Sequence, residues 1–305
     1  MALYEDLKKN FILPNAYEDW RDYRQSVTDY ILRETNQFPL PLSFSANMDE
    51  NALLPTLAIL GAGACNDINL SRLTPHFSSI TLLDCDENAM RRAIATYELE
   101  DCPYVHYKVI SLNGFEDYHY AEFCDALQEY VRCNNTNMTY AEFEEYAISL
   151  VQPYLQQMNQ RPIPLGEQEY DYICCFGVHS QLLSMFSYIY HAFDVNLCQN
   201  TFADATGNGA TFTKLLTKEN ERFVPLLHNA LFRCAKQAVL LGLETKRTNH
   251  TDAIEGAYQA LIDLQQRNFV SAQATMFWPF LPEHAITYEM SFFRVNTGMP
   301  LLFLF

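Results

Sequence analysis

Residues 57–90 constrain the fold of this chain more than any other segment. The apolar run 57–60 (LAIL) is typical of a buried parallel strand, and Gly61 and Gly63 follow it in a turn that needs backbone freedom. A second run, 79–84 (SITLLD), reads as a strand that ends in an acid. The order strand, glycine turn, helix, strand, acid predicts a βαβ unit that handles a nucleotide-like ligand.

Two features limit which ligand fits this unit: the acid at the end of the second strand and the residues that follow the two glycines. Asp84 follows Gly61 by 23 residues, close to the spacing of roughly 20 at which a carboxylate accepts hydrogen bonds from ribose hydroxyls. Cys65 stands where the dinucleotide-binding patterns GxGxxG and GxGxG diverge, and Asp67 replaces the last glycine. We expect Asn66 and Asp67 at the start of the following helix, where a carboxylate would repel a phosphate. An adenosine without phosphates therefore fits best.

The motifs GAGACND (61–67) and LLDCD (82–86) resemble the first and second motifs of the class I S-adenosylmethionine (SAM)-dependent methyltransferases. The resemblance covers roughly residues 51–296 and implies SAM as cofactor and S-adenosylhomocysteine (SAH) as product. Two positions depart from the family pattern, since Ile59 replaces a usual acid and Cys65 replaces the third glycine. The residues that the resemblance places at the cofactor are Gly61, Ala62, Gly63, Asn66, Asp67 (facing the methionine amino group), Asp84 and Cys85.

Further strands are expected at 104–112, 170–177 and 237–244, and a terminal pair at 269–277 and 286–295. A C-terminal antiparallel hairpin distinguishes a methyltransferase sheet from a dinucleotide-binding one. The sequence therefore predicts an α/β protein with a Rossmann-like, doubly wound, mostly parallel sheet that ends in an antiparallel β-hairpin.

Two helical additions complete the predicted organisation. Residues 1–50 form an N-terminal cap with apolar residues at helical spacing, and residues 51–305 form the SAM-binding domain with a helical insertion at about 115–165. The cap either packs on the core or lies across the cofactor site as a lid. The Tyr and Glu side chains of the insertion either line a substrate pocket or form a solvated face.

Ligands in open parallel sheets bind beyond the carboxyl ends of the strands, which adds two groups of candidates. The resemblance implies that Ser111, Leu112 and Asn113, after the third strand, lie at the adenine; an ordinary Asn-Gly turn is the alternative. Val178 and His179, after the fourth strand, are expected near the sulfonium. His179 is the candidate catalytic residue, as general base or substrate contact, or it is a locally hydrogen-bonded histidine.

A second glycine turn, 202–213 (FADATGNGATFT), is a rival for the cofactor loop. Its order in the chain argues against it, because the next strand-terminal acid, Glu244, lies 37 residues beyond Gly207. We expect this segment to be a loop near the active site.

The amino-acid composition limits which ligands and partners the protein is expected to bind. A net charge of −17 disfavours nucleic acid and favours a cationic or neutral substrate as well as the cationic cofactor. No apolar run reaches the roughly 18 residues of a membrane span and no signal peptide is recognisable, so a cytoplasmic protein is expected. Nine scattered cysteines without zinc spacing favour free thiols and no metal. The apolar tail 300–305 is expected to pack on the core or on the second subunit of a homodimer.

Methyl transfer to a small-molecule or short-peptide acceptor is the predicted function. Aminopropyl or aminocarboxypropyl transfer on the same fold is one alternative. A SAM-binding protein without methylation activity is the other.

Overall fold

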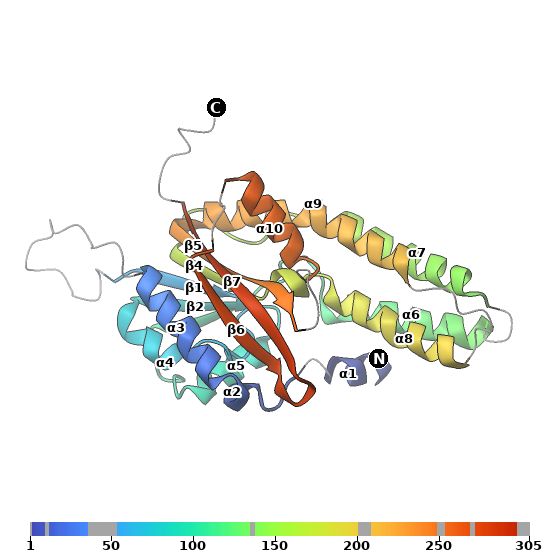
Figure 1. The fold of residues 1–305 in the computed structure, drawn as a ribbon, viewed down its shortest axis with the longest axis horizontal. Helices are drawn as coiled ribbons and strands as arrows, with labels where there is room; N and C mark the ends of the chain where they lie inside the picture. The colour runs from blue at the N-terminus through green and yellow to red at the C-terminus, as the bar shows by residue number, and fades with distance from the viewer. Residues whose placement is uncertain are drawn as a thin grey trace, which may run out of the picture.

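A seven-stranded sheet in the order β3-β2-β1-β4-β5-β7-β6 forms the centre of the protein (Figure 1). The structure is a computed structural model that describes residues 2–9, 12–35, 54–134, 138–200, 209–248, 254–268 and 272–297. The strands are β1 (Thr56–Leu60), β2 (Ser79–Asp84), β3 (Val105–Val109), β4 (Tyr170–Phe176), β5 (Ala235–Arg247), β6 (Ala274–Leu281) and β7 (Ile286–Asn296).

The first five strands are parallel, and β7 is antiparallel to both β5 and β6. The predicted doubly wound sheet with a C-terminal antiparallel hairpin is confirmed. Several strand boundaries differ from the prediction. Strand β3 ends at Val109 instead of residue 112. The fifth strand is longer, because β5 continues to Arg247 along β7, and β6 includes residues 278–281, which were expected in the hairpin loop.

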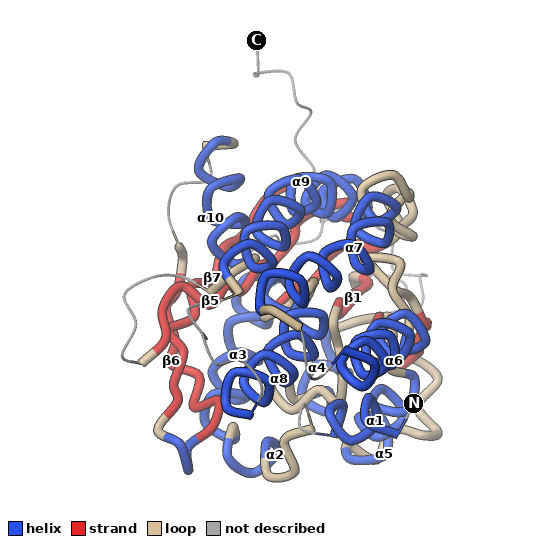
Figure 2. The backbone as a smooth tube through the Cα atoms, turned by 90° about the vertical axis from the view of Figure 1, so that its right-hand side faces the viewer, coloured by secondary structure: helices blue, strands red, loops and turns tan. Residues whose placement is uncertain are grey.

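Helices cover both faces of the sheet (Figure 2). Leu57 and Ile59 of β1 belong to one buried cluster, whereas Ala58 and Leu60 belong to the other, as the two-residue period of a strand requires. The first cluster packs under α2 (Ala16–Asp19), α3 (Arg21–Thr35), α4 (Leu70–Leu73) and α5 (Glu87–Thr96). The second packs under α6 (Asp117–Asn134), α7 (Tyr140–Met158), α8 (Ser184–Asn200), α9 (Ala210–Cys234) and α10 (Ala257–Gln266).

The predicted helical insertion is present as α6 and α7, and it does not stand alone. Helices α8 and α9, which connect β4 to β5, pack on α6 and α7, and the four helices extend together beyond the sheet (Figures 1 and 2). A buried row of Phe123, Phe143, Phe186 and Phe212 forms the core of this helical arm. The arm therefore combines chain segments from either side of β4.

The N-terminal helices divide into two groups. Val27, Tyr30 and Ile31 of α3 are fully buried, and the Tyr30 ring lies 5.0 Å from that of Phe292 on β7. Helix α3 is therefore part of the sheet's core. Helix α1 (Ala2–Lys9) instead packs on α6.

No helix within the described ranges is both long and apolar enough to cross a membrane. The cysteines whose side chains the structure describes are free thiols. The tail 300–305 lies outside the described residues.

Candidate active site

The turn after β1 brings the ends of three strands together. Gly61 and Gly63 have φ angles of 68° and 48°, in the left-handed region that favours glycine. A Cβ on Gly61 would lie 2.3 Å from Cγ2 of Val178, so only glycine fits beside the end of β4. A Cβ on Gly63 would meet no atom within 4 Å. The space beside Gly63 is therefore open to a ligand.

Asp84 closes this turn from the neighbouring strand. Its Oδ2 accepts a hydrogen bond from the Gly63 amide at 2.9 Å, and its Oδ1 accepts one from the Asp86 amide at 2.9 Å. Each carboxylate oxygen can accept a second hydrogen bond. The carboxylate is thus fixed against the glycine turn and retains acceptor capacity for a diol such as ribose.

The prediction that Asn66 and Asp67 begin a helix is wrong, because α4 begins only at Leu70 and has four residues. Side chains from other elements bind the intervening carbonyls and replace helical hydrogen bonds. Tyr97 Oη donates to the carbonyls of Cys65 and Ile68 at 2.9 and 2.7 Å. Arg24 of α3 donates to the carbonyl of Asn66 at 3.0 Å. Asn66 and Asp67 therefore lie in a turn, and the expected placement of a carboxylate at a helix N-terminus does not apply here.

Asp67 is partly accessible to solvent beside this turn. Burial raises the pKa of its carboxyl group to about 6, against the opposing effects of a backbone hydrogen bond and the Arg24 charge. Arg24 itself donates to the carbonyls of Tyr17 and Asn66, and no cation in the described parts of the chain forms a salt bridge with Asp67. An incoming ammonium group would relieve the cost of this desolvated carboxylate.

The turn after β3 is held by its own side chains. Ser111 Oγ donates to the Phe115 carbonyl at 2.7 Å. Asn113 Nδ2 donates to the Leu182 carbonyl at 2.6 Å, and its Oδ1 accepts from the Phe115 amide at 3.0 Å. The contacts of Ser111, Leu112 and Asn113 with adenine stay a prediction, for which the backbone is better placed than these engaged side chains.

His179 ends a buried chain of polar groups that we call the histidine relay: His179, His228, Asp263 and Arg267. The two imidazoles face each other, with 3.0 Å between their Nε2 atoms. His228 Nδ1 lies 2.6 Å from Asp263 Oδ2, which also accepts from Arg267 Nε at 2.6 Å. Burial lowers the pKa of both histidines, so both are neutral at pH 7.

The hydrogen bonds of the histidine relay determine which nitrogen of each imidazole carries the proton. Asp263 accepts the proton of His228 Nδ1, so Nε2 of His228 is an acceptor and His179 donates to it from its own Nε2. The His179 side chain is 1% exposed and is directed toward α9 and α10. Its role as a base stays a prediction, and the geometry favours a positioning role for this side chain.

Sequence reasoning missed Glu244 as a functional candidate and used it only to reject the rival turn. Glu244 lies in the carboxyl-terminal part of β5, is 2% exposed, and accepts a hydrogen bond from Ser180 Oγ at 2.6 Å. Burial raises the pKa of its carboxyl group. Strand order could have identified it, because β5 lies next to β4 and ends at the same edge. Gly207 of the rival turn lies outside the described residues.

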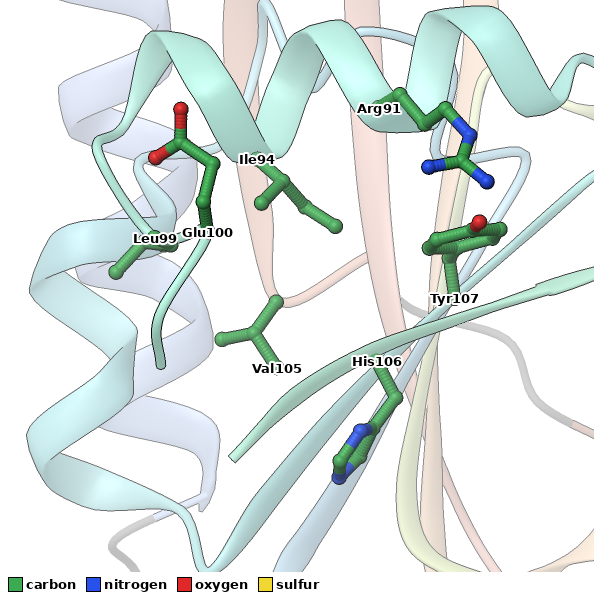
Figure 3. A pocket seen from close by; sticks show the side chains of 7 residues that line it. All are labelled: Arg91, Ile94, Leu99, Glu100, Val105, His106 and Tyr107. Atoms are coloured by element: carbon green, nitrogen blue, oxygen red, sulfur yellow. The ribbon is translucent and has the colours of Figure 1, made fainter. Parts of the chain in front are cut away.

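A surface depression of about 490 Å³ lies elsewhere, between α5 and the start of β3 (Figure 3). Val105 is the first residue of β3, so this depression is at the amino ends of the strands and not at the candidate site. It is lined by Arg91, Ile94, Leu99, Glu100, Val105, His106 and Tyr107. Among the residues that the structure describes, no group of three or more His, Cys, Asp or Glu is arranged to hold a metal ion.

No protein-family model matches the sequence, and no curated protein matches it. Two solved structures illustrate the similarity in fold. Magnesium protoporphyrin IX methyltransferase (ChlM) from Synechocystis PCC 6803 with bound SAM is 11% identical, with a TM-score of 0.41 over 93% of this chain and 85% of that chain. N-methyltransferase NodS from Bradyrhizobium japonicum WM9 in complex with SAH is 9% identical, with a TM-score of 0.40 over 95% and 97%. At these values the similarities assign no ligand or reaction to this chain, and the fold rests on the strand order given above.

Proposed function

We propose that the protein is a SAM-dependent methyltransferase that acts on a small-molecule or short-peptide acceptor. The observation that carries this proposal is the open position beside Gly63, where the turn amide is bound to the carboxylate of Asp84. A ligand in that space would meet backbone on one side and a ribose-binding acid on the other.

The two carboxylates beside the turn could each accept hydrogen bonds from a different part of SAM, the ribose or the methionine. Asp84 would accept hydrogen bonds from the ribose hydroxyls with its remaining lone pairs. Asp67 would accept from the methionine ammonium group, which would also lower the pKa of Asp67 toward its usual range. The sulfonium would then lie toward Val178, which packs against Gly61.

Bound SAM would supply an activated methyl group with a good leaving group in an in-line displacement. The chain's own residues would orient the acceptor and exclude water, and a base is needed only for an acceptor that arrives protonated. The net charge of −17 supports a cationic or neutral acceptor over a nucleic acid.

Titration calorimetry with SAM and SAH, followed by product analysis, tests the proposal. We expect both compounds to bind, and SAH to be the product when an acceptor is present. Methylthioadenosine as product would identify aminocarboxypropyl transfer instead, and the same product formed from decarboxylated SAM would identify aminopropyl transfer. Tight binding without turnover on amine, hydroxyl, thiol and peptide acceptors would identify a binding protein. Failure of both compounds to bind would contradict the cofactor assignment.

A further inference from the structure

Gly177, directly after β4, lies between a buried acid and an aromatic ring. Its φ angle is +64°, and a Cβ there would lie 3.3 Å from Oε1 of Glu244 and 3.8 Å from Cζ3 of Trp278. Any other residue would place a side chain between these groups. We call Gly177, Ser180, Glu244 and Trp278 the Gly177 subsite.

Two buried polar atoms of the subsite lack hydrogen-bond partners. Ser180 donates to Oε1 of Glu244, but Oε2 is buried with no partner among the residues the structure describes, and the same holds for Nε1 of Trp278. An unpaired buried acceptor on a carboxylate is costly, and such groups in folded proteins call for an explanation. A ligand that donates to Glu244 would supply the missing hydrogen bond.

The surroundings of Glu244 are aromatic. Trp278 stacks on Tyr23 with ring centroids 5.7 Å apart and planes inclined by 13°, and the Tyr288 ring lies 5.8 Å from Trp278. Within the described residues no cation forms a salt bridge with Glu244. A carboxylate beside aromatic rings attracts an organic cation through a charge-assisted hydrogen bond and cation–π contacts.

The subsite adjoins the proposed cofactor site. Gly177 directly precedes Val178, whose side chain touches the Gly61 position. The buried phenol of Tyr23 lies near both Asp67 and Glu244: burial is the main cause of its raised pKa, and the charges of these two acids raise it further. Tyr23 is therefore a neighbour of both the carboxylate assigned to the methionine end of SAM and the carboxylate of the subsite.

We propose, building on the proposed function, that the Gly177 subsite binds the ammonium group of a primary amine acceptor and that its nitrogen is the atom methylated. Glu244 takes one proton from the ammonium, which leaves a neutral amine with a free electron pair. That pair forms the bond from nitrogen to the methyl carbon as the bond from carbon to sulfur breaks and its electrons stay on sulfur. The products are SAH, a methylated ammonium ion and the proton on Glu244, which passes to solvent.

The raised pKa of Glu244 suits this proton transfer, because a desolvated carboxylate is a stronger base than one in water. A neutral hydroxyl acceptor would also find a base in Glu244. The hydroxyl acceptor carries no charge, so the unpaired carboxylate and the aromatic rings would not strengthen its binding. The affinity of a cation relative to that of its neutral isostere therefore tests the proposal.

Calorimetry with 2-phenylethylammonium and its neutral isostere 2-phenylethanol, each with SAH present, tests the proposal on the full chain. We expect the ammonium to bind at least about tenfold more tightly than the alcohol. Glu244→Gln preserves the shape and should remove that preference, and Trp278→Leu should weaken binding of the ammonium. Glu289→Gln on the adjacent strand β7 removes a charge outside the subsite and should leave the preference unchanged.

SAH binding separates this inference from the function it builds on. Wild type and Glu244→Gln should bind SAH equally, because Glu244 is not assigned to the cofactor. Loss of SAH binding by the wild type would contradict the methyltransferase proposal itself. Normal SAH binding without a preference for the ammonium, or an unchanged preference in Glu244→Gln, would overturn the amine assignment.

Discussion

The amide of Gly63 and the carboxylate of Asp84 are joined by a hydrogen bond of 2.9 Å that ties the turn after β1 to the end of β2. The same carboxylate holds the amide of Asp86, whose side chain caps α5 by accepting from the Ala89 amide. One acid therefore sets the shape of the glycine turn and the start of the next helix. Its remaining lone pairs are the acceptors that the proposed contact with a ribose would use.

Replacement of Asp84 by Ala should weaken SAM binding by at least about tenfold, since each hydrogen bond to a charged group contributes about 1.5–3 kcal/mol. Calorimetry measures this directly. Asp171→Ala is the matched control, because Asp171 accepts from Thr56 N and Oγ1 at 2.8 and 2.9 Å at the opposite end of β1. That variant should lose stability and keep its SAM affinity. Unchanged SAM affinity in folded Asp84→Ala would refute the site.

The two glycines of the turn should respond differently to substitution. Gly63→Val fills open space and should abolish SAM binding, at a backbone cost of about 1–2 kcal/mol for the left-handed conformation. Gly61→Ala should instead lower the unfolding temperature, because its Cβ would meet Val178 at 2.3 Å.

Gly207→Val provides the comparison for the rival turn. It should leave SAM affinity unchanged if the 61–67 turn holds the cofactor. Loss of binding in Gly207→Val with normal binding in Gly63→Val would assign the cofactor to the 202–213 segment.

The pH dependence of SAM binding should reflect the ionisation of the Asp67 carboxyl group. Its pKa of about 6 means that only about one molecule in ten carries the ionised form at pH 5, so affinity for the ammonium end should fall about tenfold between pH 7 and pH 5. Asp67→Asn should bind SAM weakly at both pH values and show a flatter profile. A wild-type profile that is flat across this range would contradict the assignment.

Asp67 should also affect stability with a definite sign. Its folded pKa lies above the ordinary value, so the folded state binds more protons than the unfolded state between about pH 4 and pH 6. The contribution of this group to stability therefore falls as pH rises through that window. Asp67→Asn should remove this part of the pH dependence in urea unfolding.

Local sequence signals predicted the framework well. The apolar runs and the glycine turn each depend on residues close together in the chain, and the structure confirms the sheet. The start of α4 was mispredicted because Tyr97 and Arg24 bind the carbonyls of the preceding turn. Neither residue is near that turn in sequence.

In the candidate site, too, features that depend on residues close in sequence were predicted, and features that depend on distant residues were not. Asp84 was recognisable from its spacing to the turn, whereas Glu244 and Trp278 meet only through the pairing of β5, β7 and β6. The helical arm likewise joins segments on either side of β4, and the amphipathic pattern of each segment does not specify its partner.

The histidine relay should contribute to stability more than to chemistry. Asp263→Ala leaves a buried histidine proton and Arg267 Nε without their acceptor, at a cost of about 3 kcal/mol in urea unfolding. His179→Asn should retain SAM binding and, where it folds, most of the turnover. A folded His179→Asn variant with normal SAM affinity and no turnover would instead establish His179 as catalytic.

Removal of α1 should affect catalysis more than folding. Lys8 pairs with Asp117 at the start of α6, and the charge of Asp86, two residues after Asp84, acts on Lys8 as well, so α1 lies near the turn after β2. Deleting residues 2–9 removes the buried Tyr4 and its 2.9 Å hydrogen bond to Asp117, and it leaves the sheet's core intact. We expect weaker SAM binding and slower turnover, because water would enter the site.

Deletion of residues 2–35 is the contrasting experiment. It also removes α3, whose Val27, Tyr30 and Ile31 are fully buried on the sheet, so this variant should fail to fold. Thermal unfolding and turnover measured on both deletions separate the two roles. If the protein lacking residues 2–9 keeps full turnover and SAM affinity, α1 is no lid and serves only to pack against the helical arm.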